Sequence, residues 1–377
     1  MIDYPAARLA AEAIHPHYLR FHESIGSSNS NAGFAPVPSR CDIEELTDAA
    51  FWTSLLREEK ANPRVSLALL PPNSQGTMQF ERPLPLLPQS LSRVAPAVER
   101  PGLHLAVWRE DGRYFIWGVM RTLPPLTLVI EVVAPGLLVI KHSRDVTSPK
   151  FANLAVLEGN RVKIIDHGST LAPNCPTPLL SLMRFDTSTE AAEISNVLVE
   201  LAVSMRAHGR GGSLLVVPAG TEDWRESILR PLAYAVSPPY AKIAYLLRQD
   251  MHQREDSVWQ RSLDRTIQAI AGLTAVDGAT LVNEHFDVLA FGTKITRRDG
   301  LPLVENVMIT EPLVDVPPVI APASEIGGTR HLSAAQFVHD QKDALALVAS
   351  QDGRFTVFAW SNCDDIVQAH MVESLLL

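Results

Sequence analysis

Hydrophobic and polar positions along the chain follow two different periods. Between about residues 64 and 170, short runs alternate as β-strands do and are separated by Pro, Gly and Asp-Gly turns. After about residue 190, apolar positions recur at helical spacing in some segments and form short unbroken runs in others. The pattern predicts an α+β or α/β protein with a β-rich N-terminal half and interleaved strands and helices after it.

The β-rich half is expected to be an antiparallel sheet or small barrel with a helix or two against it. Its predicted strands are RVSLALL, GTMQFERP, GLHLAVWRE, GRYFIWGVM, LTLVIEVV, GLLVIKH and NRVKIIDH. Asp-Gly in REDGR, residues 109–113, predicts a hairpin. Helices are expected over residues 1–24 and in CDIEELTDAAFWTSLLREE, where Asp42 is predicted to cap and Glu45 follows three residues later.

The second half begins after a proline-containing segment, LAPNCPTPLLSLMRFDT at residues 171–187, which places the predicted boundary between domains 1–185 and 186–377. A long helix there is expected to end at Gly209. A short helix is expected in DWRESILRPLAYAV, and helices are expected over about residues 239–272 and from about residue 330. The predicted strands of this half are SLLVVPA, DGATLVN, FDVLAFGTKI, ALALVAS and RFTVFAW.

Composition narrows the class of protein. A chain of 377 residues is too long for one ordinary core, and 46% hydrophobic residues indicate a folded chain. The net charge of −9 argues against general binding to nucleic acid, but it does not exclude a local anion site. Cys41, Cys175 and Cys363 lack metal-ligand spacing, and the apolar segment LTLVIEVVAPGLLVIKH is interrupted by Glu, Pro and Gly. We expect a soluble, cytoplasmic protein without a membrane span.

A first candidate for chemistry is AVDGAT, in which Asp277 stands at the beginning of a predicted strand. Gly278 would let a ligand or another backbone come close, because it has no side chain. A carboxylate at this position can hold Mg²⁺ or Mn²⁺ and can accept a proton from a hydroxyl group. The alternative is an ordinary Asp-Gly turn.

A second candidate is GGTRH, at the start of the helix predicted near residue 330. Glycine amides, Thr329 as a predicted N-cap and the positive end of the helix dipole favour an anion there. Arg330 and His331 can donate to phosphate oxygens, and Ser333 could add a hydroxyl group. The alternative is a capped surface helix whose basic residues are only solvated.

Two other clusters are interpreted as structural. The glycines of HGRGGSLLVV follow a helix and precede a strand, which is the reverse of a dinucleotide fingerprint and indicates a helix end and turn. Asp166, His167 and Ser169 in IDHGST are sequence neighbours, whereas the partners of a catalytic triad meet through the fold, so they are expected to form a strand end and turn.

The two candidate motifs occur in an order and at a spacing that resemble a known family. DGATLVNEHFDVLAFG, followed about fifty residues later by GGTRHLSAAQF and ALALVASQDGRFTVF, resembles the diadenylate cyclase (DAC) domain over about residues 190–360. The resemblance implies a mixed, twisted sheet flanked by helices. It also implies an ATP site with Mg²⁺ or Mn²⁺, and in active members two sites facing each other across a dimer make cyclic di-AMP.

Carried over by motif, the resemblance assigns roles to individual residues. Asp277 would be the catalytic and metal-binding carboxylate, Gly278 and Ala279 would lie by the nucleotide, and Ser350 would lie near it. The phosphate-binding set would contain Gly328, Thr329, Arg330, His331 and Ser333. Leu332 departs from the family, which has a second arginine there. Losing a charged donor to the transition state costs on the order of 10²–10³ in rate, while binding can survive.

The order of a β-rich half and a DAC-like half, with FWTSLLREEKANPRVSLALL and YFIWGV in the first half, resembles the predicted bacterial sensor group DACNV. Leu332, together with an otherwise intact phosphate-binding set, favours a sensor of an adenine nucleotide or cyclic dinucleotide that signals to an effector protein and that could belong to a bacterial defence or signalling system. The alternative is an active diadenylate cyclase in which another side chain replaces the missing arginine. Homo-oligomerisation follows only from the family, since a cyclase needs two facing sites and a sensor does not.

Overall fold

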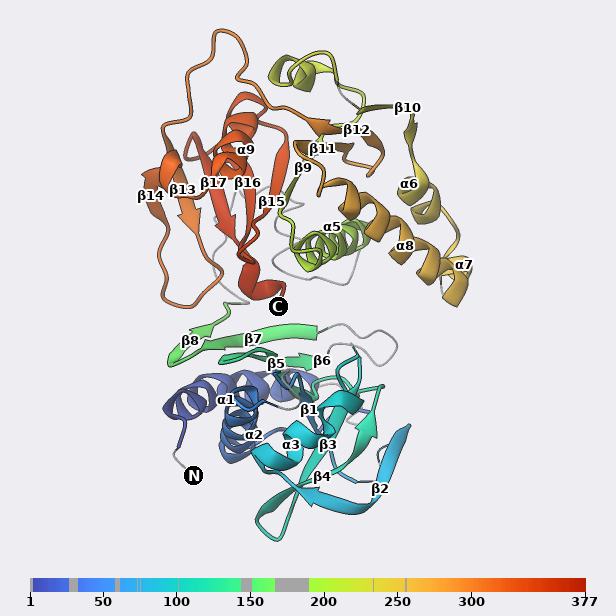
Figure 1. The fold of residues 1–377 in the computed structure, drawn as a ribbon, viewed down its shortest axis with the longest axis vertical. Coiled ribbons are helices and arrows are strands. Elements are labelled where there is room, and N and C mark those ends of the chain that lie inside the picture. The colour runs from blue at the N-terminus through green and yellow to red at the C-terminus, as the bar shows by residue number, and fades with distance from the viewer. Residues whose placement is uncertain are drawn as a thin grey trace. The chain divides into compact units, whose positions relative to one another are not determined.

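The computed structural model describes residues 3–26, 33–57, 62–72, 74, 76–100, 102–143, 151–166, 190–232, 234–254 and 256–377. Contacts divide the chain into one unit of residues 1–166 with Leu377 and a second unit of residues 167–376. The boundary predicted near residue 185 lies outside the described residues, as do His167 and Ser169. The chain is an α+β protein with a β-rich N-terminal region, as the pattern predicts (Figure 1).

The first unit is built on an eight-stranded sheet of order β2-β4-β3-β1-β5-β6-β7-β8. Neighbouring strands are antiparallel except β1 and β3, which are parallel, so the sheet is mixed and not the fully antiparallel sheet expected. The strands are β1 Ser66–Leu69, β2 Thr77–Pro85, β3 His104–Glu110, β4 Arg113–Met120, β5 Leu128–Ala134, β6 Leu137–Ser143, β7 Phe151–Glu158 and β8 Arg161–Ile164.

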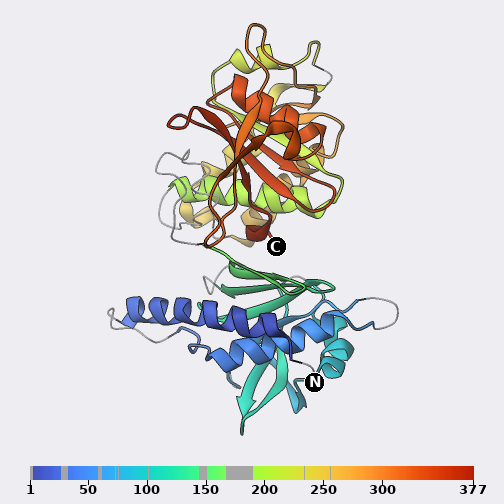
Figure 2. The same ribbon diagram turned by 90° about the vertical axis from the view of Figure 1, so that its left-hand side faces the viewer.

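Helices α1 Pro5–Gly26, α2 Arg40–Ser54 and α3 Pro88–Val94 belong to the same unit, and α1 and α2 lie on one face of its sheet (Figure 2). The larger core lies between that face and the helices, with Tyr18 and Leu46 fully buried in it. A smaller cluster is formed by the alternate strand residues, such as Ala68 and Ala106. It contains Trp117, whose Nε1 donates to the carbonyl of Leu70 at 2.9 Å. Trp117 is therefore part of the core of this unit.

Local signals in this unit were mostly sufficient. The predicted hairpin is present, because Asp111 and Gly112 both have positive φ, 47° and 77°, as a type I′ turn requires. The cap of α2 was predicted three residues too late. Ser39 is the N-cap and Asp42 occupies N3 of a capping box, with the Ser39 amide donating to Asp42 Oδ2 at 2.7 Å.

The second unit is built on a nine-stranded mixed sheet of order β10-β12-β11-β9-β15-β16-β17-β13-β14. The strands are β9 Gly212–Val217, β10 Tyr234–Tyr240, β11 Ala279–Asn283, β12 Val288–Thr293, β13 Asn306–Thr310, β14 Val319–Pro322, β15 Leu345–Ala349, β16 Phe355–Ser361 and β17 Ile366–Met371. The helices are α5 Glu190–Ala207, α6 Lys242–Leu247, α7 Met251–Arg254, α8 Ser257–Leu273 and α9 Thr329–Asp340.

Helices cover both faces of this sheet. α9 packs over β9, β15, β16 and β17, where Phe337 is fully buried against strand residues of matching parity such as Phe358. α5 contacts β15 and α8 contacts β12, and the alternate strand residues, such as Leu214 and Leu347, are also fully buried. In this arrangement the first turn of α9 lies at one edge of the sheet and its last turn at the opposite edge.

Some predictions for this unit were wrong. The short helix expected in DWRESILRPLAYAV is a 3₁₀ turn over Asp223–Ser227 followed by β10, and the long helical region splits into α6, α7 and α8. Asp256 begins α8 by accepting from the amide of Val258 at 2.9 Å. None of the helices in the described part of the chain is both long enough and apolar enough to cross a membrane.

Candidate functional site

The ends of several strands meet at one edge of the second sheet, and the residues selected from the sequence lie in the loops there. The strand register pairs Gly212, the first residue of β9, with Ala349, the last residue of β15. It also pairs Ala279, the first residue of β11, with Ser213 and with Thr293, the last residue of β12. Residues just outside these strands are therefore neighbours although they are distant in sequence.

Gly278 allows a close backbone contact at this edge. Its φ is +114°, and a Cβ on it would lie 2.5 Å from the carbonyl carbon of Gly292 and 2.7 Å from the carbonyl oxygen of Thr293. The threonine hydroxyl also donates to the carbonyl of Ala279 at 2.8 Å. The predicted close approach is thus made by another backbone, since any other residue at Gly278 would push β12 away.

This contact brings Asp277 and Lys294 together. Lys294 follows Thr293 directly, and its Nζ donates to Asp277 Oδ2 at 2.6 Å. The side chain of Lys294 is 53% exposed, and that of Asp277 is 87% exposed. The hydrogen bond and charge of Lys294 lower the pKa of Asp277, and the charge of Arg330 lowers it further. Asp277 and Arg330 therefore face the same edge of the sheet.

Arg330 lies at the start of α9, beside the turn that precedes β9. The position of a Cβ on Gly211 would be 3.0 Å from Arg330 Nη1 and 3.2 Å from the carbonyl oxygen of Ala349. Gly211 has a φ of +68°, so the glycine both permits the turn and leaves room for the guanidinium. Within the described residues, no hydrogen bond or ion pair engages the Arg330 side chain. A cation without a protein partner remains available to an anion.

His331 lies deeper than its neighbour. It is 5% exposed, and a Cβ on Gly327 would lie 2.7 Å from its Nδ1, so the glycine leaves space for the ring. Burial lowers the pKa of His331; Asp352 raises it, and the charges of Arg354 and Arg330 lower it. The imidazole is consequently neutral at pH 7 and can donate only one ring hydrogen.

Ser350 and Asp352 form the turn between β15 and β16 at the same edge. A hydrogen bond from Ser350 lowers the pKa of Asp352, and the Ser350 amide donates to the carbonyl of Arg354 at 2.9 Å. Asp352 and Arg354 of this turn both act on the pKa of His331, so Ser350 lies with the candidate cluster.

The other predicted residues occupy different environments. Gly328, not Thr329, is the N-cap of α9, and Thr329 is the first helical residue and is exposed. Among the described residues, none beyond the immediate chain neighbours has an atom within 4 Å of the place that a Cβ on Gly328 would occupy. The prediction of a threonine cap was wrong because the glycine already has the extended conformation of an N-cap. Ala279 is buried in the core, Ser333 is half-buried on α9 and Leu332 is 40% exposed.

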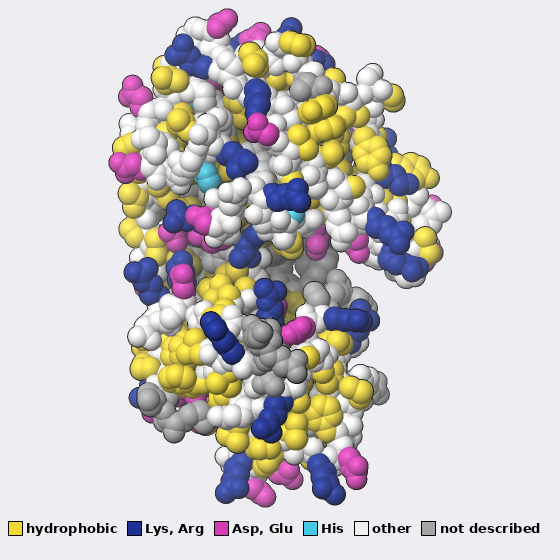
Figure 3. Space-filling view, in the orientation of Figure 1, with side chains coloured by type: hydrophobic (Ala, Val, Ile, Leu, Met, Phe, Trp, Pro, Cys, Tyr) yellow, Lys and Arg dark blue, Asp and Glu magenta, His cyan; other side chains and the backbone are white. Residues whose placement is uncertain are grey.

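An aromatic side chain beside this cluster was not predicted. Tyr234 of β10 stacks on Phe291 with ring centroids 4.8 Å apart and planes 10° apart, yet it is 51% exposed. A Cβ on Gly292 would lie 2.8 Å from its Cδ2 and 3.4 Å from Cγ1 of Val276, the residue before Asp277. Hydrophobic side chains gather over β10 and α6 in Figure 3. The register of a hairpin between the predicted strands DGATLVN and FDVLAFGTKI could have placed Lys294 beside Asp277. Nothing in the sequence indicates that Tyr234 lies near them.

The carboxylate predicted to hold a divalent cation already has a cationic partner. Mg²⁺ at a nucleotide site usually takes one or two protein carboxylates together with phosphate oxygens and water, and here Asp277 accepts from the ammonium group of Lys294. Among the residues that the structure describes, no group of three or more His, Cys, Asp or Glu side chains could hold a metal ion.

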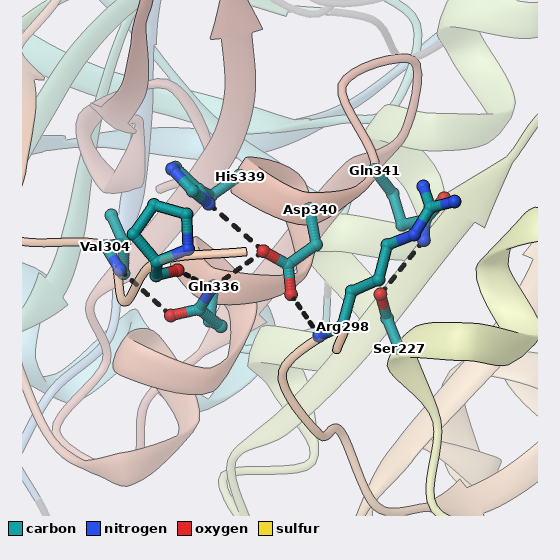
Figure 4. Close-up of polar contacts among 8 residues, drawn as sticks. Ser227, Arg298, Val304, Gln336, His339, Asp340 and Gln341 are labelled. Carbon is teal, nitrogen blue, oxygen red and sulfur yellow. Dashed lines mark hydrogen bonds and ion pairs between the residues drawn. The ribbon is translucent and has the colours of Figure 1, made fainter. Parts of the chain in front are cut away.

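A cavity of about 840 Å³ lies at the opposite edge, beside the last turn of α9. Its lining includes His339 and Asp340, which belong to a network of polar contacts (Figure 4). Asp340 has a fully buried side chain that accepts from Gln336 Nε2 at 2.8 Å, from the Arg298 amide at 2.8 Å and from His339 Nδ1 at 3.0 Å. This network connects the loop before β13 to α9, so the role of these polar side chains is to stabilise the fold.

Comparison with known proteins supplies one family match. Residues 32–121 match a probable sensor domain, DACNV. The matched span contains α2, α3 and strands β1 to β4 of the first unit. No curated protein matches the chain.

One similar solved structure is the crystal structure of a hypothetical membrane spanning protein from Bacillus cereus. It is 16% identical, with a TM-score of 0.27, and the match covers 47% of this chain and 63% of that one. The chain therefore spans less than two thirds of the length of that protein.

Proposed function

We propose that the second unit binds an adenine nucleotide or a cyclic dinucleotide, and that the first unit signals its occupancy to an effector protein. The match of residues 32–121 to a probable sensor domain supports the signalling role. The observation that carries the ligand proposal is the guanidinium of Arg330, which has no hydrogen-bond or ion-pair partner among the described residues and lies beside Gly211 and near Lys294 and Asp277 at one sheet edge.

Phosphate is the ligand group that this edge suits. Arg330 can hold two phosphate oxygens with paired N–H groups, Lys294 adds a second cation, and the first amides of α9 point outward from its N-terminus. Gly328 has no side chain to block the approach, since the position of its Cβ is open. The negative net charge of the whole chain does not conflict with this local arrangement.

The neighbouring tyrosine suits the base of a nucleotide. The ring of Tyr234 is held by Phe291 on one side and is half exposed, so its orientation is fixed before a ligand arrives. Stacking of a base on an aromatic ring is worth about 1–3 kcal/mol and needs no particular hydrogen-bond pattern. Stacking therefore favours a nucleotide over a simple polyphosphate without identifying the base.

Titration of the full chain with ATP and with cyclic di-AMP, followed by calorimetry, tests the proposal. We expect micromolar binding of at least one ligand, weakened about 100-fold by Arg330→Ala and unchanged by Arg265→Ala, which removes an exposed arginine on α8. Tyr234→Ala should weaken the nucleotide about tenfold and leave tripolyphosphate binding unchanged. Absence of binding by both nucleotides would contradict the proposal.

A working diadenylate cyclase is the second candidate, favoured by Lys294, a cation beside Asp277 that could replace the charge of the arginine missing at Leu332. In that reaction the 3′-hydroxyl of each ATP attacks the α-phosphorus of the other, losing its proton as pyrophosphate leaves. Incubation with ATP and Mn²⁺ followed by mass spectrometry separates the candidates. Cyclic di-AMP that disappears in Asp277→Asn would identify an enzyme, and its absence beside nucleotide binding would identify a sensor.

A further inference from the structure

We infer that Lys294 takes the place of the divalent cation, so that this edge binds nucleotide phosphate without a metal ion. The inference rests on the proposed function, and it specifies which cation balances the charge of the bound phosphate. Asp277 would then be the partner of a lysine and not a metal ligand. The site would recognise a nucleotide in its metal-free form or a cyclic dinucleotide.

The backbone places Lys294 where it can act in this way. Thr293 is fixed by the contact of β12 with Gly278 and by its own hydrogen bond to Ala279, so the lysine begins from a rigid position. Its ammonium reaches Asp277 at 2.6 Å while 53% of the side chain stays exposed. An ammonium has three donors, so two remain for phosphate oxygens after one is given to the carboxylate.

Charge at this edge leads to the same conclusion. A divalent cation at Asp277 would have to displace Lys294 and would then lie near its ammonium and near Arg330, both of which repel it. Phosphate meets the opposite situation, because Lys294 and Arg330 attract it and Asp277 is already neutralised. The existing pair therefore favours direct binding of the anion over binding through a metal.

The chain contains a closely matched control for Lys294. Lys342 pairs with Asp365 at 3.5 Å near the last turn of α9, and those side chains are 52% and 85% exposed. The Lys294–Asp277 pair has exposures of 53% and 87%. Lys294→Met and Lys342→Met thus remove the same group from equally exposed pairs, and only the first lies at the proposed ligand edge.

The experiment measures ATP and cyclic di-AMP affinity by calorimetry in EDTA and in excess Mg²⁺. We expect binding in EDTA within about threefold of that in Mg²⁺, and a loss of about 10- to 100-fold in Lys294→Met but not in Lys342→Met. Lys294→Arg keeps the charge and should stay within about tenfold of the parent. Asp277→Asn should keep or raise the affinity in EDTA, since it removes a negative charge. Circular dichroism and thermal unfolding of each variant report folding independently.

The alternative outcomes are distinguishable. Binding that requires Mg²⁺ and is indifferent to Lys294→Met would overturn the inference and leave the proposed function standing. Titration of the ligand-free protein with Mn²⁺, followed by electron paramagnetic resonance, should show only free ion; a bound signal that is lost in Asp277→Asn would also overturn it. If neither nucleotide binds under either condition, the proposed function fails and the inference fails with it.

Discussion

The two ends of helix α9 use polar residues in opposite ways. At the last turn, Asp340 is fully buried and accepts three hydrogen bonds from groups of the same unit (Figure 4). At the first turn, Arg330 is exposed, has no hydrogen-bond or ion-pair partner within the described residues, and lies near Lys294, one of whose ammonium hydrogens is bound by Asp277. Both ends of α9 lie against edges of the same sheet. The two sets of polar residues therefore differ in burial and in hydrogen bonding, and not in their kind of place in the fold.

The difference separates stabilising residues from residues available to a ligand. A buried polar group whose donors and acceptors are matched internally contributes to folding, and it changes little when a ligand binds nearby. A charged group without a partner contributes little to folding, but its interaction with a phosphate is not offset by an existing protein contact. Substitutions at the two ends should therefore affect different measurements.

The largest expected effect is on stability at the last turn. Asp340→Ala leaves the Arg298 amide and His339 Nδ1 without their acceptor and removes one of the two acceptors of Gln336 Nε2, so it should lower the free energy of unfolding by about 3 kcal/mol. Asp365→Asn, at an exposed carboxylate beside the same cavity whose φ of 51° asparagine tolerates, should change it by less than about 0.5 kcal/mol. Urea titration followed by fluorescence measures both. Equal effects would show that the network does not stabilise the fold, and nucleotide affinity of the folded Asp340→Ala protein should be unchanged.

A smaller effect is expected from adding charge at the first turn. Leu332→Arg introduces a cation on the exposed face beside Arg330 and should raise the affinity for ATP about tenfold at low salt, with the gain reduced at high salt. Leu332→Gln matches the polarity without the charge and should leave affinity within about twofold. A gain that is equal in the two variants would mean that removal of leucine, and not the added charge, is responsible.

The smallest effect concerns pH. Burial holds the pKa of His331 below its ordinary value of 6.5, so the free protein has a neutral imidazole at pH 7.5. A bound phosphate favours the protonated ring, so binding takes up a proton and affinity should increase as pH falls. We expect cyclic di-AMP, whose phosphodiesters do not titrate in this range, to bind about three- to tenfold more tightly at pH 5.5 than at pH 7.5. His331→Gln should remove the dependence; an unchanged slope would exclude this histidine.

Local sequence was sufficient for much of the fold. The hairpin at Asp111 and Gly112, the helix end at Gly209 and the strands ending at Ala349 and beginning at Phe355 follow from turn chemistry and period alone. Four strands were missed. β10 and β14 are edge strands that are mostly exposed, and neither has the alternation that identifies a strand. β13 and β17 were missed as well, although apolar and polar residues alternate from Val367 to Met371 in β17.

The sequence by itself determined which residue types are present, namely the carboxylate of Asp277, the basic pair Arg330 and His331, and the glycines that free the backbone around them. Only the tertiary structure decided their partners. Asp277 pairs with Lys294 because Gly278 admits β12, and Arg330 lies beside Gly211 because α9 packs over β9 and β15. The hydrophobic period and the capping residues of a segment predict which of its own positions are buried and where it begins and ends. The contacts of Asp277 and Arg330 depend instead on pairing and packing between segments that are far apart in the chain.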